Sequence, residues 1–105
     1  MGNLESYREM NDRLKELQND YDNAIKRLDG DEATKIRNRI YDLGRRSSKV
    51  MRYEIMWVSE FADEAINPEM KIGAAERIAE LESILYENTR IRSDFTLKTL
   101  QIKFN

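Results

Sequence analysis

The 105-residue chain contains 36% charged and 40% hydrophobic residues, with four glycines and a single proline. It has neither cysteine nor histidine, which excludes disulfides, thiolate nucleophiles and the Ser-His and Cys-His dyads of hydrolases. Eighteen basic and twenty acidic residues leave a net charge of −2, so no overall field attracts the chain to nucleic acid or to a membrane. We expect one domain over residues 1–105 of a cytoplasmic protein, with no cofactor, metal or catalytic site.

Hydrophobic residues repeat every three or four positions in three parts of the chain. Residues with this spacing share one face of an α-helix. The first series is Tyr7, Met10, Leu14, Leu17, Tyr21, Ala24 and Leu28; the second is Ile36, Ile40, Leu43, Ser47 and Val50; the third is Leu81, Ile84, Asn88, Ile91, Phe95, Thr99 and Ile102. The pattern predicts an all-α fold with three helices.

The first interruption of this pattern lies near residue 30. We expect the first helix to run from residue 3 to 28, with Asn3 or Ser6 as its N-cap. Gly30 can adopt the left-handed conformation that ends a helix, and Asp31 can cap the next helix.

The second interruption is the pair Asn67-Pro68, after a second helix expected over residues 32–66. Asn67 suits the N-cap and Pro68 the first helical position of a third helix. Residues 95–104 are rich in β-branched and aromatic side chains, which also permits a strand. The spacing of Phe95 and Ile102 favours a helix to about residue 100.

The short connections predict an antiparallel three-helix bundle, or an extended helical hairpin with coiled-coil-like packing. At ~1.5 Å per residue, the first helix spans about 39 Å and the other two about 52 Å each. The first helix should therefore reach only to about Trp57. The hairpin tip around Phe61, Ile66 and Met70 is expected to lie beyond it.

The second helix becomes broadly apolar in its second half. Val50, Trp57 and Phe61 continue the first stripe, whereas Met51 and Val58 belong to a second one. A middle helix that faces two neighbours needs a wide stripe, and this explains much of the pattern. The alternative is a contact surface for a protein partner or for another copy of the chain. Its candidate residues are Met51, Tyr53, Met56, Trp57, Phe61, Ile66 and Met70.

Basic residues crowd the first half of the second helix. They could follow the phosphates of a nucleic acid. We favour the alternative that they pair with acids of the adjacent first helix, because flanking charges set the register of packed helices. The basic candidates are Lys35, Arg39, Arg45, Arg46, Lys49 and Arg52, and the acids are Asp12, Glu16, Asp20 and Asp22.

Acidic residues near the hairpin tip form the one pattern with catalytic meaning. Carboxylates that face each other on antiparallel helices can hold magnesium. They are Glu60, Asp63 and Glu64 on the second helix and Glu76, Glu80 and Glu82 on the third. The spacing equally suits a solvated face, and no Gly-rich phosphate loop accompanies it, so we expect no enzyme.

Together these patterns favour a non-enzymatic, protein-binding helical module that self-associates. Small helical proteins without cofactors include adaptors, scaffolding factors and the inhibitors that phages direct against host machinery, an analogy of size and class only. The alternative function is that of an accessory protein that binds nucleic acid through its basic residues.

Overall fold

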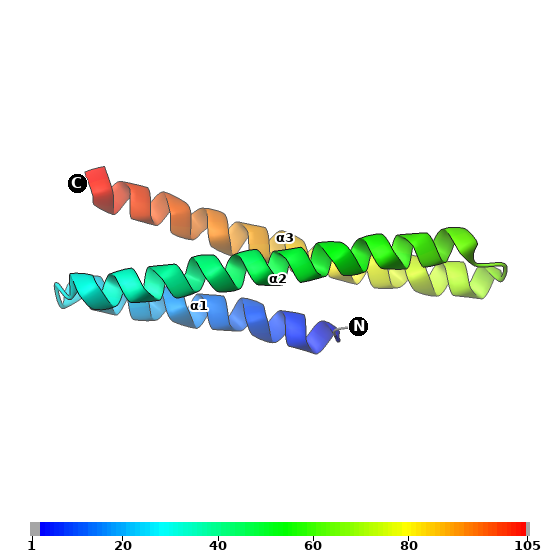
Figure 1. The fold of residues 1–105 in the computed structure, drawn as a ribbon, viewed down its shortest axis with the longest axis horizontal. Coiled ribbons are helices and arrows are strands. Elements are labelled where there is room, and N and C mark those ends of the chain that lie inside the picture. Colours follow the sequence, from blue (N-terminus) through cyan, green and yellow to red (C-terminus); the bar gives the residue numbers. More distant parts are fainter. Residues whose placement is uncertain (1–2, 105) are drawn as a thin grey trace.

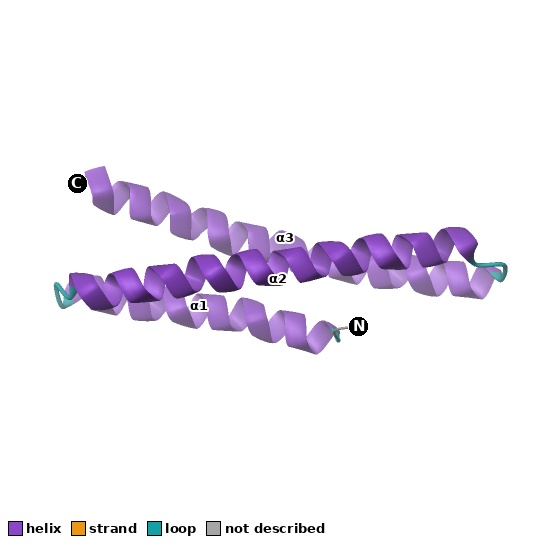
Figure 2. Cartoon of the chain, viewed as in Figure 1, coloured by secondary structure: helices purple, strands orange, loops and turns teal. Residues whose placement is uncertain are grey.

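The computed structural model describes residues 3–104, and their side chains as far as residue 101. Helix α1 spans Leu4–Lys26, α2 spans Gly30–Glu64 and α3 spans Pro68–Phe104. The three helices run up, down and up, and they form a rod of 59 × 22 × 15 Å (Figures 1 and 2). The predicted all-α antiparallel bundle is confirmed.

The turn between α1 and α2 differs from the prediction. Leu28, not Gly30, takes the left-handed conformation, with φ of 58°. The N–H of Asp29 then donates to the carbonyl of Ala24 at 2.9 Å, which closes the end of α1. The carboxylate of Asp29 accepts from the N–H of Glu32 at 3.1 Å, so Asp29 rather than Asp31 caps α2. The turn begins two residues earlier than expected. Leu28, although a member of the predicted apolar series, is therefore not part of the core and is 93% exposed.

The remaining helix ends follow the sequence more closely. Asn3 caps α1 by accepting from the N–H of Ser6 at 2.9 Å. Asn67 accepts from the N–H of Glu69 at 2.7 Å, and Pro68 is the first residue of α3. Helix α2 ends two residues before the predicted position. Residues 95–104 are helical, which settles the choice left open between helix and strand.

Two apolar clusters form the core of the described part of the chain. The cluster near the α1–α2 turn consists of Leu14, Leu17, Tyr21, Ala24, Ala33, Ile36, Ile40, Ile91 and Phe95. Its centre is aromatic: the ring of Phe95 meets Tyr21 edge-on at 5.0 Å and Tyr41 at 5.8 Å between centroids. The second cluster, near the start of α1, consists of Tyr7, Met51, Leu81 and Ile84. Most of the three predicted series is thereby buried.

Val50 is an exception to the predicted series, because the core continues through Met51 instead. Met51 is fully buried, whereas Val50 is exposed. From Ser47 onward the buried line of α2 passes through Met51, Glu54 and Val58. This line still faces both neighbours near the start of α1, because Met51 clusters with Tyr7 of α1 and Leu81 of α3, and Glu54 accepts from the hydroxyl of Tyr7.

A polar layer separates the two clusters and includes one buried side chain from each helix. Asn88 on α3 donates from Nδ2 to Asn11 Oδ1 at 3.0 Å and to Ser47 Oγ at 2.9 Å. Asn11 donates in turn to the carbonyl of Ile84 at 3.0 Å. Only one alignment of the three helices satisfies these bonds, so the layer specifies their register.

Candidate protein-binding surface

Helix α1 covers only the first two-thirds of α2. It begins at Leu4, and the hydroxyl of Tyr7 donates to Glu54 at 2.9 Å, which marks how far along α2 it reaches. Beyond this level α2 packs against α3 alone (Figure 1). The predicted mismatch of helix lengths is confirmed, and α2 has an uncovered face there.

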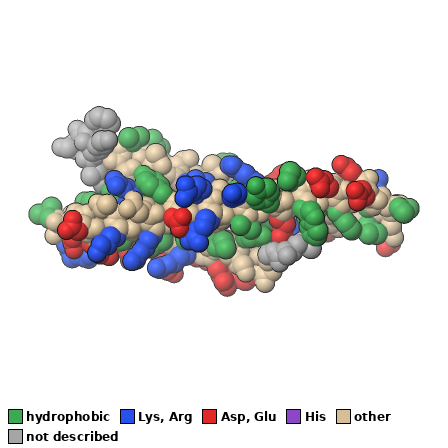
Figure 3. Space-filling model, viewed as in Figure 1, with side chains coloured by type: hydrophobic (Ala, Val, Ile, Leu, Met, Phe, Trp, Pro, Cys, Tyr) green, Lys and Arg blue, Asp and Glu red, His purple; other side chains and the backbone are tan. Residues whose placement is uncertain are grey.

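Five large apolar side chains are exposed on α2, from just before this level to beyond it. Each is between 45% and 57% exposed. We call them the apolar surface: Val50, Tyr53, Met56, Trp57 and Phe61. Figure 3 shows hydrophobic side chains gathered over this part of α2. Single exposed apolar residues are ordinary, but a contiguous group of them is typical of a contact site.

Trp57 lies between two shallow grooves. The groove toward α1, of about 480 Å³, is lined by Tyr7, Val50, Tyr53, Glu54, Met56, Trp57 and Glu60. The groove toward α3, of about 370 Å³, is lined by Trp57, Val58, Phe61, Ala74 and Arg77. A ridge with a groove on either side offers a partner both a contact and recesses for its own side chains.

The other predicted binding residues divide between core and tip. Met51 is fully buried, so it does not belong to the apolar surface, and that assignment was wrong. Ile66, in the turn between α2 and α3, is 98% exposed, and Met70 on α3 is 44% exposed. The hairpin tip therefore extends the accessible apolar area past the end of α2.

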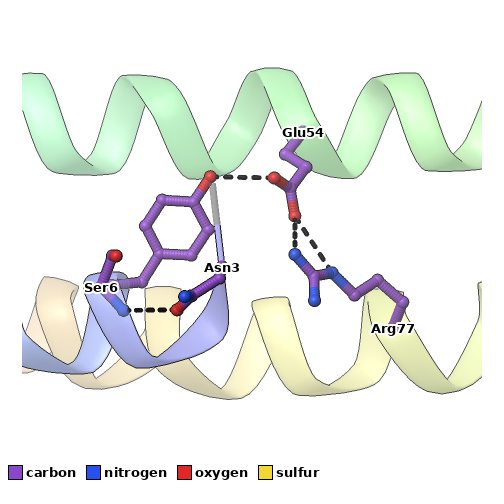
Figure 4. Close-up of polar contacts among 5 residues, drawn as sticks. Asn3, Ser6, Glu54 and Arg77 are labelled. Atoms are coloured by element: carbon purple, nitrogen blue, oxygen red, sulfur yellow. Dashed lines mark hydrogen bonds and ion pairs between the residues drawn. The ribbon is translucent and has the colours of Figure 1, made fainter. Parts of the chain in front are cut away.

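A buried ion pair between Glu54 and Arg77 lies next to the apolar surface. Glu54 on α2 accepts from Tyr7 on α1 and from the guanidinium of Arg77 on α3 (Figure 4). Its Oε2 atom lies 2.8 Å from Arg77 Nη2 and 3.1 Å from Nε. This three-helix contact was not predicted. Its signal is that Glu54 falls on the buried line between Met51 and Val58.

The predicted ion pairs between α1 and the basic residues of α2 do not form. Arg45 and Arg46 pair with Asp42 of their own helix, at 3.6 and 2.9 Å. Asp22 of α1 pairs with Lys98 of α3 at 2.9 Å. Between residues 3 and 101 no ion pair joins α1 to α2.

The polar side of α1 faces α3 instead. Lys15 lies 2.7 Å from Glu87, and this hydrogen bond, with the charge of Glu87, raises the pKa of Lys15 above its ordinary value. Gln18 donates to the carbonyl of Ile91 at 2.9 Å. Because these contacts use the flank of α1 next to α3, the basic side chains of α2 remain at the surface.

Four cationic side chains meet in an open groove of about 500 Å³ between α2 and α3. The groove is lined by Arg45, Ser48, Lys49, Arg52, Tyr53, Met56 and Arg92. Arg92 comes from α3 and was not predicted. Its side chain crosses α2 at Gly44, where the missing Cβ leaves room for it: a Cβ at this position would lie only 2.9 Å from the side chain of Arg92. The guanidinium of Arg92 also donates to Ser48 Oγ at 3.1 Å. A hairpin that turns at Asn67 places position 92 beside Gly44, so Arg92 could have been predicted from the sequence as a neighbour of the basic side chains of α2. Lys35 and Arg39 do not line this groove.

Neither a metal cluster nor a membrane span appears in the described part of the chain. No three acidic side chains there, including Glu60 and Glu80, gather closely enough to hold a metal ion. No helix there is sufficiently long and apolar to cross a bilayer. The geometry thus offers two features: the apolar surface, and the groove lined by Arg45, Lys49, Arg52 and Arg92, which we call the basic groove.

No family model, curated protein or solved structure matches the chain.

Proposed function

We propose that this chain is a non-enzymatic module that binds another polypeptide through the apolar surface and the hairpin tip, as adaptors, scaffolds and inhibitors do. The observation that carries the proposal is the run of half-exposed aromatic and methionine side chains on α2 from Tyr53 to Phe61, at and beyond the level where α1 begins. Aromatic residues and methionine are enriched in the buried centres of protein interfaces. Tryptophan and tyrosine are also the usual energetic anchors there.

The energetic gain from covering this surface is substantial. Covering the exposed half of a tryptophan side chain removes roughly 100 Å² from water, which contributes roughly 2–3 kcal/mol. Trp57 has aromatic or methionine neighbours on both sides along the helix, so a partner that covers it also covers Tyr53 or Phe61. The flanking grooves allow a partner to contact the sides of the indole as well as its face.

Phe61→Ala is expected to weaken association while leaving the fold nearly intact. Phe61 is 49% exposed, so its truncation should lower the free energy of unfolding by much less than the about 3–5 kcal/mol of a sealed core. An aromatic anchor lost from an interface costs about 2 kcal/mol, or about thirtyfold in Kd. Thermal melting and sedimentation equilibrium on the same samples measure the two effects.

Tyr86→Ala is the matched control, because Tyr86 is an exposed aromatic residue on α3 outside the apolar surface. It should change neither the melting temperature nor the association. Unfolding of the Phe61→Ala protein, with unchanged binding per folded molecule, would show that the tip belongs to the core. A host protein captured by the parent and by Tyr86→Ala, but lost with Phe61→Ala, would identify a foreign partner for this surface.

The second candidate function is nucleic-acid binding at the basic groove. It is favoured by the convergence of Arg45, Lys49, Arg52 and Arg92, with no α1 acid paired to them in the described part of the chain. Replacing Lys49, Arg52 and Arg92 with alanine should then abolish binding to duplex DNA. Each phosphate contact contributes about −0.9 to the slope of log K against log salt concentration. Replacing Lys35 and Arg39 is the control, and a parent that binds no duplex at low salt would eliminate this function.

A further inference from the structure

The outward face of α2 changes its charge along the helix in a definite order. Figure 3 shows Lys and Arg side chains on the half of α2 next to the α1 turn, hydrophobic side chains in the middle and acidic side chains toward the hairpin tip. The basic block includes Arg45, Arg46 and Lys49; the acidic block is Glu60, Asp63 and Glu64. A helix with this order of charges is complementary to a second copy of itself that runs in the opposite direction.

The match holds residue by residue. The midpoint of the two blocks lies between Glu54 and Ile55. Positions equally distant from it pair Lys49 with Glu60, Arg46 with Asp63 and Arg45 with Glu64. The same operation places Tyr53 opposite Met56 and Arg52 opposite Trp57, which is a suitable cation–π pair. All ten of these side chains are exposed in the single chain.

We propose that the partner of the apolar surface is a second copy of this chain, with the two α2 helices packed antiparallel about a two-fold axis near the Glu54–Ile55 midpoint. A two-fold interface uses the same patch on both copies, which requires such self-complementarity. The proposal rests on the function proposed above, since it assigns an occupant to the same apolar surface. The apolar centre supplies affinity, and the charged ends set direction and register.

The charges at the end of α2 support this assignment. Asp63 and Glu64 lie in the last turn of the helix, which contains no basic residue. Negative charge at a helix C-terminus is unfavourable because the helix dipole is also negative there. None of the three acids of this block forms an ion pair with another described side chain. Arginines from a second copy would neutralise them.

The basic block is accessible for these contacts. Among the described side chains, Arg45 and Arg46 form ion pairs with Asp42 of their own helix alone, and both are largely exposed. Lys49 is exposed as well, and its ammonium group lies 5.9 Å from the centroid of the Tyr53 ring. Exposed pairs within one helix contribute little, so exchanging them for contacts across the interface is not opposed. Lys35 lies nearer the start of α2 than the basic block. It is outside the overlap of the two helices, because the position that the two-fold operation pairs with it would fall beyond the end of α2.

Exchange of one charged pair tests the arrangement. Lys49→Glu places two carboxylates opposite each other at both ends of the interface, and Glu60→Lys places two ammonium groups there. Each variant alone should dimerise at least about tenfold more weakly than the parent. In a one-to-one mixture each contact has opposite charges again. The mixture should therefore form a heterodimer of nearly parental affinity, as measured by sedimentation equilibrium and native mass spectrometry.

Lys35→Glu is the control: it makes the same charge change on the same helix outside the overlap and should leave the dimer unchanged. Because the parent has no cysteine, Met56→Cys adds an independent readout. Position 56 lies next to the proposed axis, so mild oxidation should give a disulfide-linked dimer, whereas Lys35→Cys should not. Far-UV circular dichroism verifies that every variant is folded.

Two outcomes overturn the proposal. A parent that stays monomeric at high micromolar concentration excludes a second copy as the occupant, and a foreign partner sensitive to Phe61→Ala would then leave the proposed function intact. A parental dimer whose two charge variants are not rescued by mixing excludes this antiparallel register. If Phe61→Ala also leaves every association unchanged, the proposed function fails as well.

Discussion

Asn88→Ala is expected to lower the free energy of unfolding by about 3 kcal/mol. The side chain is fully buried and donates to both Asn11 and Ser47. Its removal leaves Asn11 Oδ1 buried without a donor, which costs about 1–3 kcal/mol, and leaves a cavity as well. Chemical denaturation followed by circular dichroism measures the loss. The variant should remain helical, because the two apolar clusters on either side are unchanged.

The paired change Asn11→Leu with Asn88→Leu is the informative control. It replaces both amide groups with apolar side chains of similar size and leaves neither partner stranded. Its stability should equal or exceed that of the parent, because replacing both partners of a buried hydrogen bond by apolar groups costs little, and the change also removes Asn88 Oδ1, which is buried without a partner in the described part of the chain. Equal destabilisation by Asn88→Ala and by the pair would show that packing volume, and not hydrogen bonding, governs this layer.

Arg77→Ala is expected to have the other large effect, a loss of about 3 kcal/mol. Removing one partner of a buried ion pair costs about 3–5 kcal/mol, because the remaining charge is uncompensated. The side chain of Glu54 is only 5% exposed, but that of Arg77 is 29% exposed, so the lower end of this range applies. Thermal and urea unfolding of the Arg77→Ala protein measure the loss.

Replacing both members of the pair separates charge from packing. The double change Glu54→Leu with Arg77→Leu should recover most of the stability lost in Arg77→Ala, since no buried carboxylate remains. Arg77→Lys should be intermediate, because an ammonium group cannot make both of the guanidinium contacts seen here. If Arg77→Ala melts like the parent, water reaches Glu54 and the pair is a surface feature.

The sequence by itself determined the helices, their order and the uncovered face of α2. The spacing of apolar residues is a local property, and it correctly placed Leu14, Ile40 and Phe95 in the core. The Asn67-Pro68 pair acts within a single turn, so its capping role was also readable. Helix length follows from residue number alone, which is why Trp57 was expected near the limit of α1.

The tertiary structure alone decided which flank of each helix meets a neighbour. A 3-4 series does not distinguish Val50 from Met51, because these residues lie three and four positions after Ser47. Packing against Tyr7 of α1 and Leu81 of α3 buries Met51. For the same reason Asp22 faces Lys98, and the basic side chains of α2 gain Arg92 as a neighbour. Periodicity defines one face of a helix, but the rotation of that helix about its own axis is set by packing against two others at once.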